Sequence, residues 1–95
     1  MILKTFEDEQ VVFYRGDESD SYIMILDGQV TLYSTKFPDE NALIRPLHSG
    51  DALGEIGIIQ KKPRSLSCIS NGCSVLYIDV PTFQRTMKIT VNKQV

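Results

Sequence analysis

Residues 11–33 read VVFYRGDESDSYIMILDGQVTLY, a stretch in which β-branched and aromatic runs alternate with turn signals. The runs cover residues 11–14, 22–26 and 30–33, and the last alternates apolar and polar side chains as a half-buried strand does. Asp27-Gly28 stands between the second and third runs and is a strong short-range signal for a β-hairpin. We therefore predict short antiparallel strands joined by tight turns over this part of the chain.

The carboxyl-terminal half continues the strand pattern. Residues 42–47 predict a broken or edge strand, because Pro46 cannot donate a hydrogen bond to a sheet ladder. Residues 65–70 and 74–78 predict two more strands, with Asn71-Gly72 as the turn between them.

Two helices complete the predicted elements. A single helical turn is expected near residues 55–59, and Asp79 is placed to cap a helix over residues 80–88. Phe83 and Met87 lie four residues apart and would share one face of that helix. The predicted fold is mainly β: an antiparallel β-roll or jelly-roll-like barrel with one short helix and a C-terminal helix.

Composition narrows the classes of function. The 95 residues suffice for one compact domain, and the net charge of −2, without any run of Lys and Arg, argues against nucleic-acid binding by this piece. The longest apolar run is far too short to insert into a membrane. Cys68 and Cys73 match neither a redox pair nor a zinc site, so we expect free thiols packed in strands in an intracellular, cytoplasmic protein.

The segment from Leu53 to Ser67 carries the candidate chemistry. Residues 53–57 read Leu-Gly-Glu-Ile-Gly, and Pro63-Arg64-Ser65 follows a short distance later. Glycines let backbone N–H groups approach an anion, and Arg64 supplies a planar fork that suits phosphate oxygens. The carboxylate of Glu55 suits a sugar hydroxyl instead. The pattern favours a sugar phosphate, although a plain solvated loop is the alternative interpretation.

Two parts of the chain resemble the cyclic-nucleotide-binding domains of protein kinase A regulatory subunits, cGMP-dependent kinases, gated channels and the bacterial cAMP receptor protein. The first is residues 12–30, where Gly16 and Gly28 fall on the strand-turn-strand signature of that family. The second is the phosphate-binding cassette, whose Phe-Gly-Glu-Leu-Ala core and following Pro-Arg-Ala-Ala resemble residues 53–57 and 63–66. The resemblance implies one β-roll domain over residues 1–95, with cAMP or cGMP as its ligand and no further cofactor.

The resemblance also implies a role for each site residue. Glu55 would accept a hydrogen bond from the ribose 2′-OH, Arg64 would pair with the cyclic phosphate, and Leu32 would contact the base. The phosphate cradle would be completed by backbone groups of Gly54, Ile56 and Ser65 or Leu66. Family members with a hydroxyl at the position of Ser65 include both cAMP and cGMP binders, so both ligands stay open.

The sequence departs from the family pattern at a few positions. Leu53 replaces the usual Phe, Gly57 and Leu66 stand where Ala is common, and Ser19 stands where Gly or Ala often precedes the Asp. Family members also carry helices before the roll and a longer helix after it. We therefore expect this chain to be a fragment of a larger protein, with an effector domain in the same or a partner chain.

These residues leave three classes of function open. The leading hypothesis is a regulatory sensor whose C-terminal helix moves when the nucleotide binds. The alternative is a degenerate domain of the same fold that binds no nucleotide and serves in protein docking or assembly. An enzyme is not expected, because Ser65, Ser67 and Cys68 have no histidine near them in the sequence.

Overall fold

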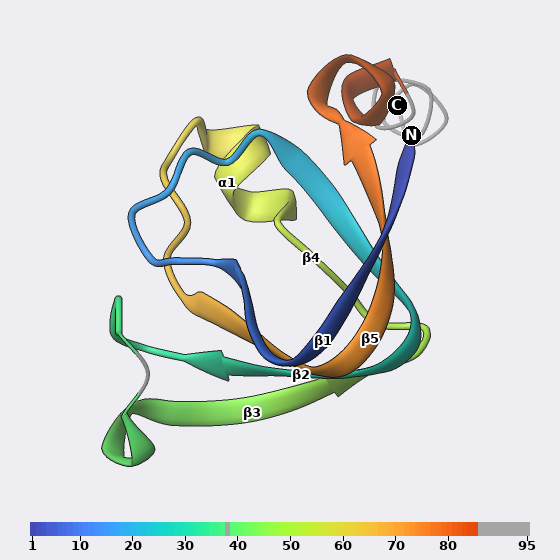
Figure 1. Ribbon diagram of the computed structural model, residues 1–95. Helices are drawn as coiled ribbons and strands as arrows, with labels where there is room; N and C mark the ends of the chain where they lie inside the picture. The colour runs from blue at the N-terminus through green and yellow to red at the C-terminus, as the bar shows by residue number, and fades with distance from the viewer. Residues whose placement is uncertain (38, 86–95) are drawn as a thin grey trace.

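The computed structural model describes residues 1–37 and 39–85 as a curved antiparallel sheet with short helices (Figure 1). Residues 80–85 form a helical segment that follows the last strand. The remaining elements, in chain order, are β1 (Ile2–Phe13), β2 (Ser21–Tyr33), η1 (Glu40–Ala42), β3 (Leu43–His48), β4 (Ala52–Leu53), α1 (Glu55–Gln60) and β5 (Ser67–Asp79).

The strands form one open sheet in the order β1-β5-β2-β3, and the short strand β4 pairs with β2 outside this path. All pairings are antiparallel. The sheet curls so that α1 lies at its open side, as the predicted β-roll requires (Figure 1). The predicted fold class, mainly β with a short helix near residue 55, is confirmed.

Both predicted hairpin turns are wrong. Asp27-Gly28 lies inside β2 and Asn71-Gly72 lies inside β5, and the two long strands pair with each other through a register shift on each side of Gly28. Gly28 has a φ of 81°, and a Cβ there would collide with the carbonyl oxygen of Gly72. These glycines therefore serve β-bulges that bend two continuous strands, and the same residue types occur in bulges and in turns.

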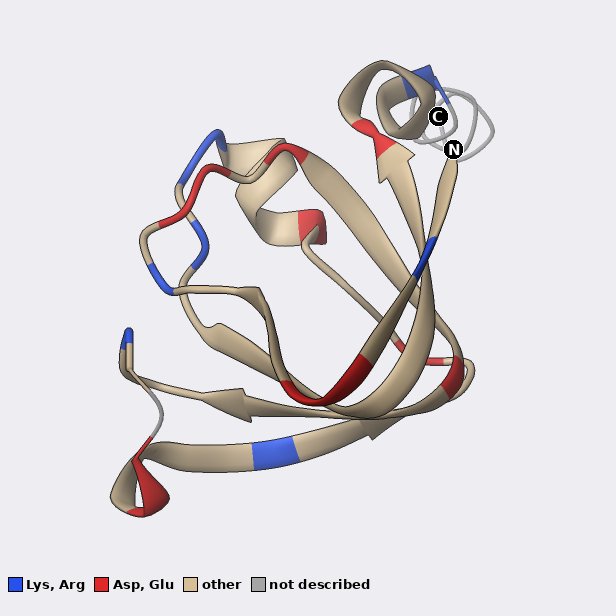
Figure 2. Ribbon diagram, viewed as in Figure 1, with Lys and Arg blue, Asp and Glu red and all other residues tan. Residues whose placement is uncertain are grey.

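The N-terminal strand is much longer than the sequence predicts. The predicted run at residues 11–14 is only its end, because β1 pairs with β5 from Ile2↔Tyr77 onward. Its first residues are mostly exposed and include the acidic run at residues 7–9, so they lack the alternation that marks a half-buried strand. Figure 2 shows this acidic stretch on β1, while Lys and Arg are spread over many described elements.

The core lies between β2 and β5, with Leu47 added from β3. Its buried members are Ile23, Ile25, Val30, Leu32, Leu47, Cys68, Cys73 and Val75. Cys68 and Cys73 are free thiols, as predicted. Burial, helped by the neighbouring Cys73, raises the pKa of Cys68 to about 12. Both cysteines therefore act as small apolar core residues.

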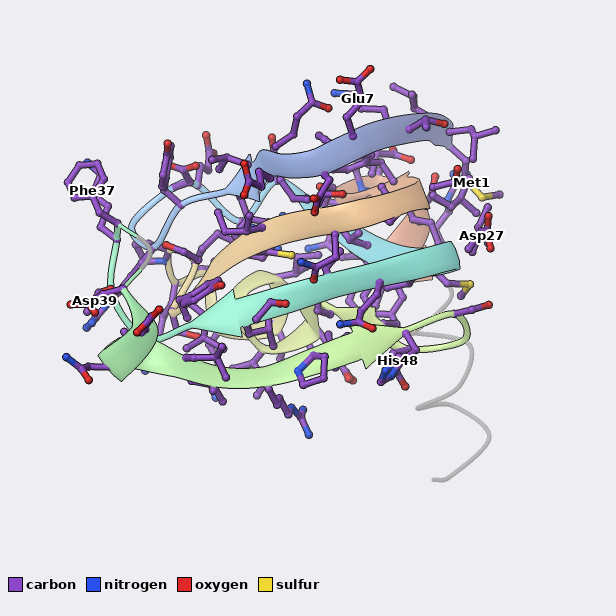
Figure 3. The ribbon with its side chains drawn as sticks, turned by 60° about the horizontal axis from the view of Figure 1, so that its bottom comes forward. Met1, Glu7, Asp27, Phe37, Asp39 and His48 are labelled. Atoms are coloured by element: carbon purple, nitrogen blue, oxygen red, sulfur yellow. The ribbon has the colours of Figure 1, made fainter. Side chains whose placement is uncertain are left out.

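The predicted edge strand at residues 42–47 is observed as β3, one residue further along. Pro46 pairs with Thr31 of β2 and sits on the edge strand, the position where a missing N–H group is tolerated. Figure 3 places His48 at one end of this strand, while Phe37 projects at the opposite end of the sheet and packs edge-on against Tyr14.

The helical segment at residues 80–85 begins directly after Asp79, as predicted. Hydrogen bonds from the Thr82 hydroxyl and from the Thr82 backbone N–H lower the pKa of the Asp79 carboxylate, and the backbone bond is the one expected of an N-cap. Phe83 is buried and stacks on Tyr22, with ring centroids 4.8 Å apart, which attaches the segment to β2. The predicted partner Met87 and the rest of the helix predicted to end at residue 88 lie outside the described residues.

Candidate functional site

Gly54 joins β4 to α1 and makes room for the arginine of the site. It adopts a φ of 99°, which disfavours other residue types, and forms the N-cap of α1. A Cβ at this position would lie 2.5 Å from Arg64 Nη1 and 3.0 Å from the Ser21 carbonyl oxygen. Glycine is therefore required both by the backbone conformation and by the close approach of the guanidinium. Glu55 begins α1 next to it and is exposed.

Arg64 is the central cation of the site. The residue is only 6% exposed, and the guanidinium lies over the ring of Phe13, 4.6 Å from the centroid. Nη2 donates to the Ser21 carbonyl oxygen at 2.9 Å and to the Ser21 hydroxyl at 3.3 Å. Asp20 Oδ1 stands 3.6 Å from Nη2, but its side chain is 74% exposed, so it compensates the buried charge only in part.

Two donor atoms of Arg64 remain without a partner. Nε and Nη1 are buried, and neither makes a hydrogen bond within the described chain. Burial lowers the pKa of Arg64, and this effect is larger than that of the nearby Asp20 carboxylate, which raises it. Native proteins rarely leave buried donors unsatisfied, and an unpaired buried charge is unfavourable. The arrangement suits an anion that accepts these two donors.

The loop between β1 and β2 holds the backbone of Arg64. The Arg64 N–H donates to the Asp17 carbonyl at 2.8 Å, and the Gly16 N–H donates to the Arg64 carbonyl at 2.9 Å. The Asp17 carboxylate in turn accepts from the Tyr14 N–H at 2.9 Å. The turn at residues 15–17 therefore positions the arginine from a distant part of the sequence.

One cavity of about 350 Å³ contains every predicted site residue. The predicted site residues in its lining are Leu32, Gly54, Glu55, Ile56, Arg64, Ser65 and Leu66. Leu32 and Arg64 are buried, Leu66 is partly buried, and Glu55, Ile56 and Ser65 are exposed. The cavity volume is within the range of small-molecule sites, roughly 300–1,000 Å³. The cassette residues and the distant Leu32 thus share one site.

The sequence motifs do not identify Phe13, Arg45 and Lys62, which also line the cavity. Arg45 pairs directly with Leu32 across β2 and β3. Its position could have been found only from the pairing of these strands, since Arg45 belongs to neither sequence motif. The guanidinium of Arg45 has no hydrogen bond or ion pair among the described residues.

The cavity combines polar and apolar groups that can contact a small molecule. It offers unpaired cationic donors at Arg64, a carboxylate acceptor at Glu55 and an apolar wall at Leu32. No group of three or more potential metal ligands was found in the described part of the chain. Across residues 1–37 and 39–85, no helix is long and apolar enough to cross a bilayer.

The curved sheet and the cavity beside α1 together define a β-roll domain with a cavity of small-molecule size. The family model for the cyclic nucleotide-binding domain matches residues 3–90, and the chain belongs to this family. The resemblance read from the two sequence motifs is thereby confirmed.

Similar proteins carry the same type of domain. The chain is 29% identical over 70 residues to a cAMP-dependent protein kinase regulatory subunit of Dictyostelium discoideum, covering 70% of this chain and 21% of the relative. It is 30% identical over 80 residues to Rap guanine nucleotide exchange factor 3 of Mus musculus, covering 82% and 8%. The structure of cAMP-bound PfPKA-R matches with a TM-score of 0.77 at 27% identity, covering 88% of this chain and 28% of that one.

Proposed function

We propose that this domain binds cAMP or cGMP in the cavity beside α1 and acts as a non-catalytic regulatory sensor. The observation that carries the proposal is Arg64, a buried guanidinium with two unpaired donors on the wall of that cavity. A cyclic phosphate supplies the negative charge and the acceptors that these donors lack. The family membership and the cAMP-bound PfPKA-R structure support the same ligand class.

The proposed pose follows the lining of the cavity. The cyclic phosphate pairs with Arg64 and with backbone N–H groups of Gly54, Ile56 and Ser65 or Leu66. The ribose 2′-OH donates to Glu55, and the base packs on the side of Leu32. Each contact uses a residue that lines the cavity, and the two charged contacts match donors with acceptors.

Arg45 gives a reason to expect guanine in the base position. Its register partner is Leu32, the residue proposed to contact the base. A guanidinium donates well to the two acceptors O6 and N7 of guanine, whereas adenine presents a donor beside its N7. We expect Arg45→Met to weaken cGMP binding about tenfold and cAMP binding less than threefold, measured by calorimetry. Equal losses for both nucleotides would refute a role in base selection.

The sensor role rests on elements beside the cavity. Ile56 and Ile59 of α1 are 68% and 55% exposed. A second cavity of about 480 Å³ lies between α1 and the C-terminal helical segment and is lined in part by Ile58 and Val80. Nucleotide binding at the N-terminal end of α1 would shift the equilibrium between two arrangements of the helical segment at residues 80–85, which lies across the second cavity from α1. The exposed isoleucines offer a contact surface for an effector domain.

The domain is proposed to be one module of a longer intracellular protein. The chain spans only 21% and 8% of the two curated relatives described above. The two buried free thiols fit a reducing compartment. The alternative of a docking domain that binds no nucleotide is favoured by the exposed isoleucines of α1, but it leaves the buried, unpaired donors of Arg64 without a purpose.

Calorimetric titration of the 95-residue chain with cAMP and cGMP tests the proposal. We expect binding of at least one nucleotide, and a loss of about 1.5 kcal/mol or more in Arg64→Ala, because a charged hydrogen bond is removed. The matched control is Arg15→Ala, whose guanidinium donates to the Ser34 carbonyl away from the cavity lining. A folded chain that binds neither nucleotide at millimolar concentration supports the docking alternative.

A further inference from the structure

Gly57 occupies the middle of α1 without a conformational reason to be glycine. It has no positive φ, so the backbone at this position accepts any L-residue. Alanine is the better helix former, and the helix is only six residues long. The requirement for glycine must therefore come from the space around it.

The space beside Gly57 is filled by Ser19. A Cβ at position 57 would collide with Ser19 Oγ, and it would lie 2.9 Å from Ser19 Cβ and 3.1 Å from the Lys62 carbonyl oxygen. Real Cβ atoms essentially never make contacts below 3.0 Å, and the contact with the Lys62 carbonyl oxygen is tighter than most; all three atoms belong to the short Ser19 side chain or to the backbone. The side chain of Ser19 therefore takes the volume that a larger residue at position 57 would use.

Ser19 also makes a hydrogen bond in that position. Its hydroxyl donates to the Lys62 carbonyl oxygen at 2.6 Å, across 43 residues of sequence. The Lys62 N–H donates to the Gly57 carbonyl at 2.9 Å. The three residues thus form one closed unit at the C-terminal end of α1, just before Arg64.

We infer that Ser19 and Gly57 are a complementary pair, in which Ser19 is a positioning residue for the arginine of the site. The β1–β2 loop already holds the Arg64 backbone at Gly16 and Asp17. The hydrogen bond from Ser19 to the Lys62 carbonyl attaches the same loop to the end of α1 and to the segment that leads into Arg64. Ser19 and Gly57 are two of the positions at which the sequence departs from the family pattern. In the structure the two residues are in contact, so the two departures depend on each other.

A double-mutant cycle on the full 95-residue chain tests the pair. Gly57→Ala, Ser19→Gly and the double variant are compared with the wild type by thermal unfolding and by titration with cAMP and cGMP; the binding readout rests on the function proposed above. We expect Gly57→Ala alone to lower the melting temperature and to weaken nucleotide binding about tenfold. The double variant should regain the melting temperature lost in Gly57→Ala and bind no more weakly than Ser19→Gly alone, because the collision is gone while the Ser19 hydroxyl is still missing.

Ser19→Ala separates positioning from packing. It keeps the Cβ and removes only the hydroxyl, so we expect a loss of about two- to tenfold in affinity, the range of one hydrogen bond, with a smaller fall in the melting temperature than in Gly57→Ala. Ser19→Thr, which keeps the hydroxyl, should restore most of that affinity. A Ser19→Ala variant with wild-type affinity would refute the positioning role.

The outcomes distinguish this inference from the proposed function. If the wild type binds neither nucleotide, the proposed function fails, while the melting temperatures of the cycle still decide whether the two residues are complementary. If Gly57→Ala does not fold, recovery of folding in the double variant supports the pair. Additive effects of the two single changes, or a Gly57→Ala variant that equals the wild type, would overturn it.

Discussion

Arg64 is buried although its charge is only partly compensated in the described chain. Nε and Nη1 lack acceptors, and the carboxylate of Asp20 is mostly exposed. Buried charges that are poorly paired can often be replaced by apolar residues of similar size without loss of stability. The Arg64 side chain is therefore better suited to binding a ligand than to stabilising the free domain.

We expect Arg64→Met to abolish nucleotide binding while leaving the free energy of unfolding equal to that of the wild type or higher by up to about 2 kcal/mol. The methionine side chain can pack on the ring of Phe13, which now lies 4.6 Å from the guanidinium carbon. Denaturant unfolding and calorimetric titration of the same preparation measure both effects. A strongly destabilised Arg64→Met variant would show that the guanidinium serves the fold instead.

It could be predicted that Glu55 and Arg64 lie at one cavity, because their signal is local. A glycine beside an acid, followed by Pro-Arg, describes a cassette within one short stretch of sequence, and the structure places both residues at one cavity. Arg45 could not be predicted in the same way. Its place beside Leu32 is set by the register of β2 and β3, which no local pattern specifies.

The long strands β2 and β5 bend where glycines allow their backbones to meet. Gly28 pairs with Cys73, and its missing side chain leaves space for the Gly72 carbonyl oxygen. Gly28→Ala should lower the free energy of unfolding by about 2 kcal/mol or more, because a positive φ and an overpacked contact add together. Denaturant unfolding monitored by circular dichroism measures the loss.

Gly72→Ala is the matched control for the bend. Gly72 has a similar φ of 88°, but a Cβ there would meet nothing within 4 Å. Only the backbone strain applies, which is about 1–2 kcal/mol. If both variants lose the same stability, the close approach of β2 to β5 is not what selects glycine at position 28.

Element boundaries were harder to predict than element types. Strands, the short helix and the Asp79 cap follow from residue types and periodicity. Asp27-Gly28 and Asn71-Gly72 predict hairpin turns but lie in bulges, since the same dipeptides provide a positive φ in turns and in bulges. Only the pairing of β2 with β5 along their whole length distinguishes the two cases, and that pairing joins residues far apart in the sequence.

The cap at Asp79 makes the C-terminal helical segment sensitive to pH. Hydrogen bonding with Thr82 lowers the pKa of Asp79 below its ordinary value of 3.8. The folded state therefore binds fewer protons, so the cap stabilises fully above pH 3.8 and loses its effect as the pH falls through the lower folded-state pKa.

Asp79→Ala should accordingly lower the melting temperature at neutral pH, and Asp79→Asn should lower it less, because asparagine is also a good N-cap. The difference between wild type and Asp79→Ala should shrink as the pH is lowered below 3.8. Melting curves recorded across the acid range check this. A difference that stays constant down to the acid limit would contradict the cap.

The whole domain joins a curved sheet to a ligand cavity through one short helix. β2 supplies Leu32 and the core, the β1–β2 loop holds Arg64, and α1 covers the opening of the sheet (Figure 1). A chain of 95 residues buries a limited core, so ligand binding should contribute visibly to its stability. This coupling is what a regulatory module requires, since a ligand that stabilises one arrangement shifts the population toward it.

The state of the Arg64 guanidinium in solution tests the central claim most directly. In the 15N-labelled chain, the resonance of the Arg64 Nε–H group reports on a donor that is buried and unpaired in the free domain. On addition of cAMP or cGMP we expect a large downfield shift of this proton and slower exchange with solvent, because the phosphate accepts it. An Nε–H resonance that stays unchanged at saturating nucleotide would contradict the proposed phosphate site.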